Sequence, residues 1–259
     1  MQLPISKIEF YNMVPNNGTI LEIGPYASPI FKRPMFNVFY ADILTSDQIK
    51  EECIRHNRNY SDVPDCIDIL VNVDTRPTLS SNIKFTTIFS SHNIEHHPDL
   101  INHLQEVSNV AEHNARFYLA IPDKRYSLDH WHAETTIADV IAAHIEERKN
   151  HTMSTHLNNI LFTAEHNEDE SLHWIGEHGP DLKLPTIDQN YIGKIKHGIS
   201  TIIAKKDRYT DQHNWYFTPK TFEHIFNLLE KLNYSDWILE SIYNTRPGSH
   251  EFYAILRKK

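Results

Sequence analysis

The sequence predicts an α/β fold in which helices flank a mostly parallel, seven-stranded sheet that ends in a C-terminal β-hairpin. In the first half of the chain, short runs of β-branched and aromatic residues alternate with polar or helix-like stretches, as in βαβ units. Two more runs lie near the C-terminus, on either side of the turn signal Arg246-Pro247-Gly248. With 259 residues and no internal repeat, the chain is expected to fold as a single domain over residues 1–259.

The runs in the first half have the lengths of strands, and they cover residues 19–23, 38–41, 67–73, 86–90 and 116–121. Between the last two runs, Leu100, Leu104, Val107 and Ala111 would share one face of a helix, and Pro98 suits its first turn. A crossover helix of this kind makes the two strands that it connects parallel.

The last third of the chain predicts a helix and a hairpin after an inserted segment. Thr218 can cap a helix that begins at Pro219, and strands at 235–241 and 250–258 would form the hairpin. Residues 124–214 are instead polar and rich in histidine, with weak helix signals at 135–148 and 155–166. We therefore expect residues 124–214 to form a cap inserted into the sheet domain.

The charge and cysteine content of the chain limit its partners and its location. A formal net charge of -9 argues against a general binder of nucleic acid or anionic membranes, because both need a positive protein surface. No apolar run approaches the roughly 18 residues that cross a bilayer, so a cytoplasmic protein without a membrane span is expected. Cys53 and Cys66 are not spaced as a disulfide framework or a zinc ribbon.

The stretch from Thr19 to Phe31 places a carboxylate and a glycine where an open α/β sheet binds ligands, beyond the carboxyl ends of its strands. Glu22 lies in the first expected strand, and Gly24 after it would let the backbone approach a ligand closely. Asp42 ends the second strand and can accept two hydrogen bonds from a ribose diol. The alternatives are that Gly24 only makes a turn and that Asp42 only caps the next helix.

Four segments together resemble the class I S-adenosylmethionine-dependent methyltransferases over nearly all of the chain. They are the first-strand motif LEIGPYASPIF, the second-strand acid in FYADIL, IFSSHNIEHHPDL after the fourth strand and YLAIPDKRYSLDH after the fifth. The last of these, with HNWYFT before the final helix, is similar to bacterial methyltransferases of capsule and surface-polysaccharide synthesis. The resemblance implies a Rossmann-like sheet and S-adenosylmethionine as cofactor. Tyr26 and Ser28 depart from the family, which more often has glycine at these positions.

The resemblance also implies a set of cofactor contacts. Glu22 would orient the loop or the amino end of the cofactor, Gly24 would let the methionine portion approach, and Asp42 would hold the ribose hydroxyls. The other positions implied to line the cofactor pocket follow the third and fourth strands: Asp74, Ser91, His92 and Asn93. Asp74 would contact the adenine side, with a solvated loop aspartate as the alternative, and His92 has a helix-entry position as its alternative.

Methyl transfer to a hydroxyl needs alignment of two reactants and one base. Histidine suits the base because its pKa lies near neutrality. His213 is the first candidate, since it ends the insertion and precedes an aromatic cluster in which Trp215 could form a wall for the acceptor. Asp129 or His130, after the fifth strand, is the second candidate. A surface histidine in a loop is the alternative for His213.

The acceptor is expected to be a small molecule, namely a sugar or nucleotide-linked sugar such as a heptose. Asp123, Lys124, Arg125 and Tyr126 follow the fifth strand and would line its site, and the two basic residues would meet a phosphate. A solvated basic loop is the alternative. Methylation of a phosphorylated polysaccharide-modifying group also stays open, as does a homodimer.

Two other classes of protein fit parts of the sequence. His92, Glu95 and His96 match the His-x-x-Glu-His pattern of some zinc peptidases, although that motif belongs well inside a helix and here it follows a strand directly. A non-catalytic Rossmann-fold partner that has lost cofactor binding is the third possibility. No metal site is predicted, while carboxylates and histidines near the insertion leave metal assistance open.

Overall fold

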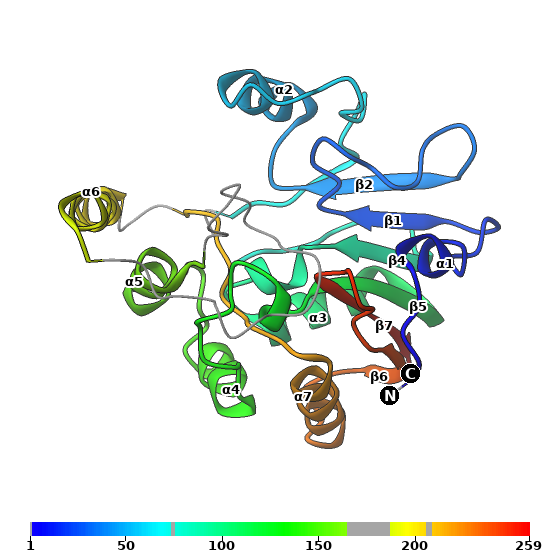
Figure 1. Ribbon diagram of the computed structural model, residues 1–259. Helices are drawn as coiled ribbons and strands as arrows, with labels where there is room; N and C mark the ends of the chain where they lie inside the picture. The colour runs from blue at the N-terminus through cyan, green and yellow to red at the C-terminus, as the bar shows by residue number, and fades with distance from the viewer. Residues whose placement is uncertain (1, 74–75, 165–186, 206–208) are drawn as a thin grey trace.

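The computed structural model describes residues 2–73, 76–164, 187–205 and 209–259. Within these residues, a seven-stranded sheet has the order β3-β2-β1-β4-β5-β7-β6 (Figure 1). The strands are parallel to their neighbours up to β5, and β7 is antiparallel to both β5 and β6. The predicted fold class is therefore confirmed, including the C-terminal hairpin.

The strands have the following bounds: β1 Ile20–Ile23, β2 Val38–Asp42, β3 Ile69–Leu70, β4 Phe85–Ser91, β5 Ala111–Pro122, β6 Trp237–Tyr243 and β7 Glu251–Lys258. Because β1 lies between β2 and β4, the chain leaves β1 in one direction and later returns on its other side. The topological switch point thus lies between the carboxyl ends of β1 and β4, which is where open α/β sheets bind ligands.

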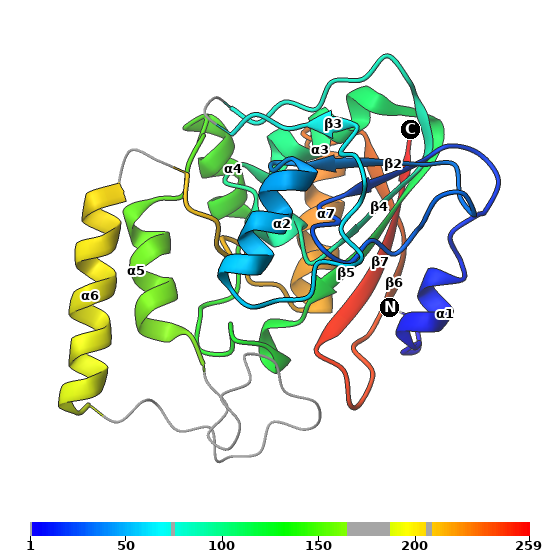
Figure 2. The same cartoon turned by 90° about the horizontal axis from the view of Figure 1, so that it is seen from above.

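Each face of the sheet carries its own apolar layer, because successive side chains of a strand point to opposite faces. On β5, Phe117 and Leu119 belong to the layer that includes Leu104, whereas Tyr118 belongs to the layer that includes Phe10. Helices α3 (Leu100–Val110) and α7 (Pro219–Lys231) cover the first face, and α1 (Lys7–Tyr11) covers the second (Figure 1 and Figure 2). The sheet is buried on both sides, which holds its strand ends in fixed positions.

The predicted C-terminal helix is confirmed, except that Leu232, expected in its buried stripe, follows the helix and is 51% exposed. The side chain of Thr218 accepts a hydrogen bond from the backbone of Thr221, and Pro219 occupies the first helical position of α7. The buried side chains of this helix repeat with helical spacing: Phe222, Ile225, Phe226 and Leu229.

The segment between β5 and α7 contributes three helices within the described residues: α4 (Ile137–Ile145), α5 (Met153–Phe162) and α6 (Gln189–Lys205). They lie beyond the carboxyl ends of the parallel strands, with α6 outermost (Figure 1 and Figure 2). The sequence signals for α4 and α5 are confirmed, whereas α6 carried no prediction. The remaining helix, α2 (Ser46–Arg55), lies beside the β2 end of the sheet. None of the described helices has the length and apolar character needed to cross a membrane.

Three local predictions are wrong. Asp99 and not Pro98 adjoins α3, because the Asp99 carboxylate accepts the backbone N–H of Asn102 and so caps the helix. Ala111 begins β5 and does not end the helix, since it pairs with Phe85 across an irregular register. The third strand, expected over residues 67–73, is shorter: β3 covers only Ile69–Leu70, with the N–H groups of Asp68 and Val71 donating to β2 on either side of it.

Candidate functional site

Gly24 and Asn93 meet at the switch point, from the loops that follow β1 and β4. Gly24 has a φ of 69°, a conformation that favours glycine, and its N–H donates to the carbonyl of Ala41 at 2.8 Å. A Cβ atom added to Gly24 would lie 2.6 Å from Nδ2 of Asn93. Because Gly24 has no side chain, the amide of Asn93 can pack against its backbone between the carboxyl ends of β1 and β4.

Replacing Gly24 with alanine is expected to destabilise the protein by about 1–2 kcal/mol, because a side chain at positive φ is strained and must displace Asn93. Chemical denaturation measures this change. Gly193→Ala is the matched control: Gly193 lies in α6 with nothing within 4 Å of its added Cβ, so this change is expected to be neutral or stabilising. If Gly24→Ala were as stable as the natural protein, the close contact between Gly24 and Asn93 would not be a constraint on this loop.

Glu22 organises the loop after β1. Its carboxylate is 2% exposed and accepts the backbone N–H groups of Ile30 at 2.7 Å and Phe31 at 3.0 Å. Burial raises the pKa of Glu22 to about 7, although the two amide donors favour the charged form. The geometry agrees with the expectation that this acid orients the loop.

Asp42 ends β2 next to that loop. Its carboxylate accepts the backbone N–H groups of Tyr26 at 3.2 Å and Leu44 at 3.1 Å, one on each oxygen. Burial raises the pKa of Asp42, and Asp211 from the segment before α7 adds to this effect. Each carboxylate oxygen keeps a further acceptor site, so the side chain can still bind a diol.

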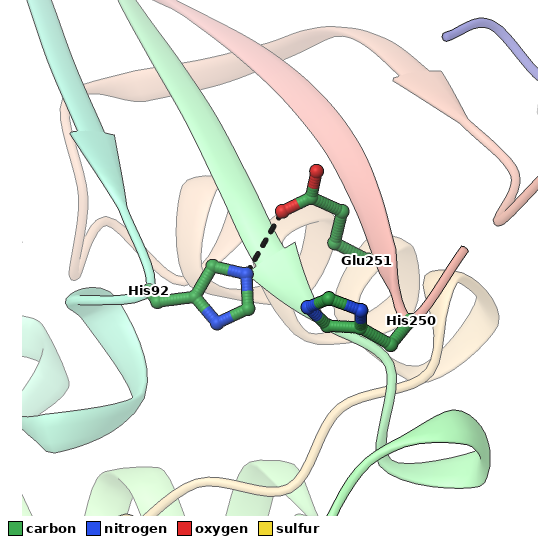
Figure 3. Close-up of side chains that lie close together, drawn as sticks. All are labelled: His92, His250 and Glu251. Carbon is green, nitrogen blue, oxygen red and sulfur yellow. Dashed lines mark hydrogen bonds and ion pairs between the residues drawn. The ribbon is translucent and has the colours of Figure 1, made fainter. Parts of the chain in front are cut away.

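His92 follows β4 and turns toward the start of β7. Its φ is 48°, and its Nε2 lies 2.8 Å from the Glu251 carboxylate, with His250 beside it (Figure 3). Glu251 also accepts a hydrogen bond from Tyr253 at 2.8 Å and lies 3.6 Å from the ammonium of Lys7. This carboxylate is fully satisfied, and the His92 side chain is fixed across the end of β5. Ser91, the last residue of β4, precedes it at the same edge.

The structure brings together the first and second base candidates. Nδ1 of His213 lies 2.7 Å from Oδ2 of Asp129, which is 1% exposed. Burial alone would lower the pKa of His213, but the Asp129 carboxylate, with help from Glu95, raises it to about 9. Burial alone would raise the pKa of Asp129, but the nearby His213 lowers it. With this pKa His213 carries a proton at neutral pH, so it can act as a base only after it has released that proton.

Glu95 and His96 complete a cluster around His213. They belong to the short 3-10 helix η1 (Ile94–His96) that follows β4. Oε1 of Glu95 lies 3.6 Å from Nε2 of His96 and 3.8 Å from Nε2 of His213. Nδ1 of His96 lies 3.1 Å from the Asp211 carboxylate. Three loops that are distant in the sequence thus place imidazoles and carboxylates at one edge of the sheet.

The residues that follow β5 are already paired with each other. Arg125 donates two hydrogen bonds to Asp123, at 3.0 and 2.6 Å, and its guanidinium lies 5.1 Å from the ring centre of Tyr126. Lys124 is 8% exposed and donates to the carbonyl of His130 at 3.0 Å. A phosphate group would therefore have to compete with Asp123 for Arg125.

Two other predicted site residues, Trp215 and Asp74, do not contribute side chains to this edge of the described structure. Trp215 is 2% exposed within the core, where its indole N–H donates to the carbonyl of His97 at 2.6 Å. Asp74 lies outside the described residues. Asp211 and Glu251 carried no prediction, because nothing in the local sequence sets them apart from other acids.

The peptidase motif does not form in the described structure. His92 has left-handed backbone and pairs with Glu251, whereas His96 pairs with Asp211. Only Ile94–His96 is helical, as a single 3-10 turn. The two histidines therefore do not face one ion as they would from consecutive turns of an α-helix.

No protein-family model and no curated protein matches the sequence. Among solved structures, the glycopeptide N-methyltransferase MtfA complexed with S-adenosyl-L-homocysteine is 12% identical, with a TM-score of 0.47 over 97% of this chain and 88% of that chain. The CcbJ methyltransferase from Streptomyces caelestis is 10% identical, with a TM-score of 0.46 over 97% and 93% of the two chains. Coclaurine N-methyltransferase bound to N-methylheliamine and SAH is 14% identical, with a TM-score of 0.31, and the match covers 45% of this chain and only 36% of that chain. At these values the likenesses carry no argument on their own, and the fold assignment rests on the strand order.

Proposed function

We propose that this chain is an S-adenosylmethionine-dependent methyltransferase, most specifically an O-methyltransferase of a sugar or nucleotide-linked sugar used in a capsular or surface polysaccharide. The observation that carries the cofactor assignment is the switch point itself. Gly24 lets its backbone meet Asn93 closely beside the end of β4, and Asp42 presents a buried carboxylate at the adjacent strand end, where it accepts backbone N–H groups of the loops around it. The sugar acceptor and the pathway rest on the resemblance of the IPDKRYSLDH and HNWYFT segments.

Within this proposal, the chain binds and orients both reactants. Asp42 would hold the ribose hydroxyls, and Gly24 with Asn93 would flank the methionine portion. When bound, S-adenosylmethionine supplies an electrophilic methyl group. The Asp129–His213 pair lies at the same edge of the sheet, where it would act on the proton of the acceptor hydroxyl.

The proposal is tested in two steps, because cofactor and acceptor are separate questions. Calorimetric titration with S-adenosylmethionine asks whether the cofactor binds. A screen of nucleotide sugars and phosphorylated sugars, read by mass as one added methyl group, then asks for the acceptor. Absence of cofactor binding would favour the non-catalytic Rossmann-fold partner. If only phosphorylated modifying groups were methylated, the acceptor would be such a group and not a sugar or nucleotide-linked sugar.

Changing Asp42 to alanine is expected to weaken S-adenosylmethionine binding at least tenfold, which corresponds to a loss of about 1.4 kcal/mol in hydrogen bonds to the ribose. Calorimetric titration measures the dissociation constant, with circular dichroism to confirm folding. Asp65→Ala removes an exposed aspartate and controls for net charge. An unchanged dissociation constant in a folded Asp42→Ala protein would remove the ribose assignment.

A further inference from the structure

The Glu95 carboxylate is fully buried, and no hydrogen bond from the described residues offsets the cost of removing it from water. The residue is 0% exposed, and neither carboxylate oxygen has a hydrogen-bond partner among the described residues. A buried carboxylate is costly unless it is paired closely or coordinates a metal ion. Its nearest charged neighbours, His96 and His213, are at 3.6 and 3.8 Å, beyond hydrogen-bond distance.

Those distances suit three ligands around one ion. Imidazole nitrogen and carboxylate oxygen bind a zinc-like ion at about 2.0–2.2 Å, which separates two ligands by about 3.3 Å in a tetrahedral site. The ligand atoms of Glu95, His96 and His213 all lie within 4.8 Å of one another. The two distances to Glu95, 3.6 and 3.8 Å, are close to the tetrahedral separation.

The far sides of both imidazoles are also arranged as in metal sites. Nδ1 of His213 faces Asp129 at 2.7 Å, and Nδ1 of His96 faces Asp211 at 3.1 Å. Histidines that bind metals commonly donate their other ring N–H to a carboxylate, which fixes the tautomer and turns the free nitrogen to the ion. Here both Nε2 atoms are left facing Glu95.

We propose that Glu95, His96 and His213 bind one divalent transition-metal ion, with Zn²⁺, Co²⁺ or Mn²⁺ as the class that suits two imidazoles and one carboxylate. Asp129 and Asp211 orient the two histidines without touching the ion. Three protein ligands leave at least one coordination position for another group.

The second cluster of this kind, around Glu251, does not support the same proposal. His92, His250 and Glu251 are also close together (Figure 3). However, the Glu251 carboxylate already accepts a hydrogen bond from Tyr253 and pairs with His92 and Lys7. An ion there would have to displace these partners, whereas the Glu95 carboxylate accepts no hydrogen bond from the part of the chain that the structure describes.

The site lies directly after β4, next to the switch point, and this gives the ion a use. If methyl transfer occurs as proposed above, the open position would bind the acceptor hydroxyl oxygen and favour loss of its proton to water. The oxygen could then form its bond to the methyl carbon as the bond from that carbon to sulfur breaks. The role of the ion in methyl transfer rests on the proposed function. The binding of the ion does not, because it is measured without any substrate.

The test uses the full chain after treatment with a chelator, titrated with Co²⁺ and followed by visible absorption, and with Zn²⁺ followed by calorimetry. One equivalent is expected to bind. His96→Gln and His213→Gln are each expected to weaken binding at least a hundredfold, and Glu95→Gln likewise where it folds. His113→Gln, which removes an exposed histidine of β5, is the matched control and should bind as the natural protein does.

The outcomes separate the alternatives. Failure to bind either ion, or binding that survives both histidine changes, overturns the site. Binding that is lost instead in His92→Gln and His250→Gln moves the ion to the Glu251 cluster and equally overturns it. Titration of the metal-free protein with S-adenosylmethionine tests the two proposals separately. If the cofactor binds and no metal ion does, only the metal-site proposal is overturned.

Discussion

Replacing His213 with alanine or asparagine is expected to reduce turnover about a hundredfold or more while leaving the affinity for S-adenosylmethionine intact. The reason is that, within the proposed function, the deprotonated imidazole of His213 would take the proton of the acceptor hydroxyl, and such proton removal contributes about 10²–10⁴ to the rate. Its Nδ1 bond to Asp129 fixes the direction of the imidazole. Turnover is measured with the acceptor found in the screen, and cofactor affinity by calorimetry.

The matched control is His113→Ala, which removes an exposed histidine far along β5 from the carboxyl edge. A His213→Ala protein with full activity would leave Asp129 or His130 as the base, or no base at all. Chelation then distinguishes how His213 acts. Turnover that survives removal of metal from the natural protein assigns His213 as the base, as the sequence predicts. Turnover that is lost and restored by Zn²⁺ or Mn²⁺ assigns it as a ligand.

The sequence could predict most of the sheet because its signals are local. The α7 helix carries its own cap at Thr218 and its own start at Pro219, and both are confirmed. Glu22 lies inside β1 and Asp42 ends β2, as the apolar runs around them predict. The edge strand β3 is shorter than expected. The composition of a segment does not show how many of its residues pair with the neighbouring strand.

The pairing of site residues could not be predicted, because it depends on how distant loops pack. Asp129 and His213 are separated by 84 positions, and each was a candidate for a different reason. Asp211 became a partner of His96 only through the path of the segment before α7. Trp215 was expected to form an acceptor wall because it begins an aromatic cluster after His213, yet its ring is buried in the core, where its indole N–H donates to the carbonyl of His97.

Glu22 is expected to make the folded protein less stable as the pH rises from about 4.5 to about 7. Burial raises the pKa of Glu22 from its usual 4.5 to about 7 in the folded state, so over this range the folded chain keeps a proton that the unfolded chain has released. The free energy of unfolding therefore falls with increasing pH, by up to about 3 kcal/mol from this one group. Glu22→Gln cannot ionise and should lack this part of the pH dependence.

Denaturation by urea at about pH 5 and about pH 8 measures the effect as the difference between the two free energies of unfolding. The comparison concerns this difference and not the absolute stability. Ile30 and Phe31 donate to different oxygens of Glu22, and glutamine replaces one of these oxygens with an NH₂ donor, which adds a cost that does not depend on pH. The same measurement on Glu112→Gln, which removes an exposed glutamate of β5, gives the contribution of net charge. If the natural protein and Glu22→Gln lose stability in parallel, Glu22 is ionised throughout. The loop after β1 would then be held by a buried charge, and not by a carboxyl that titrates near neutrality.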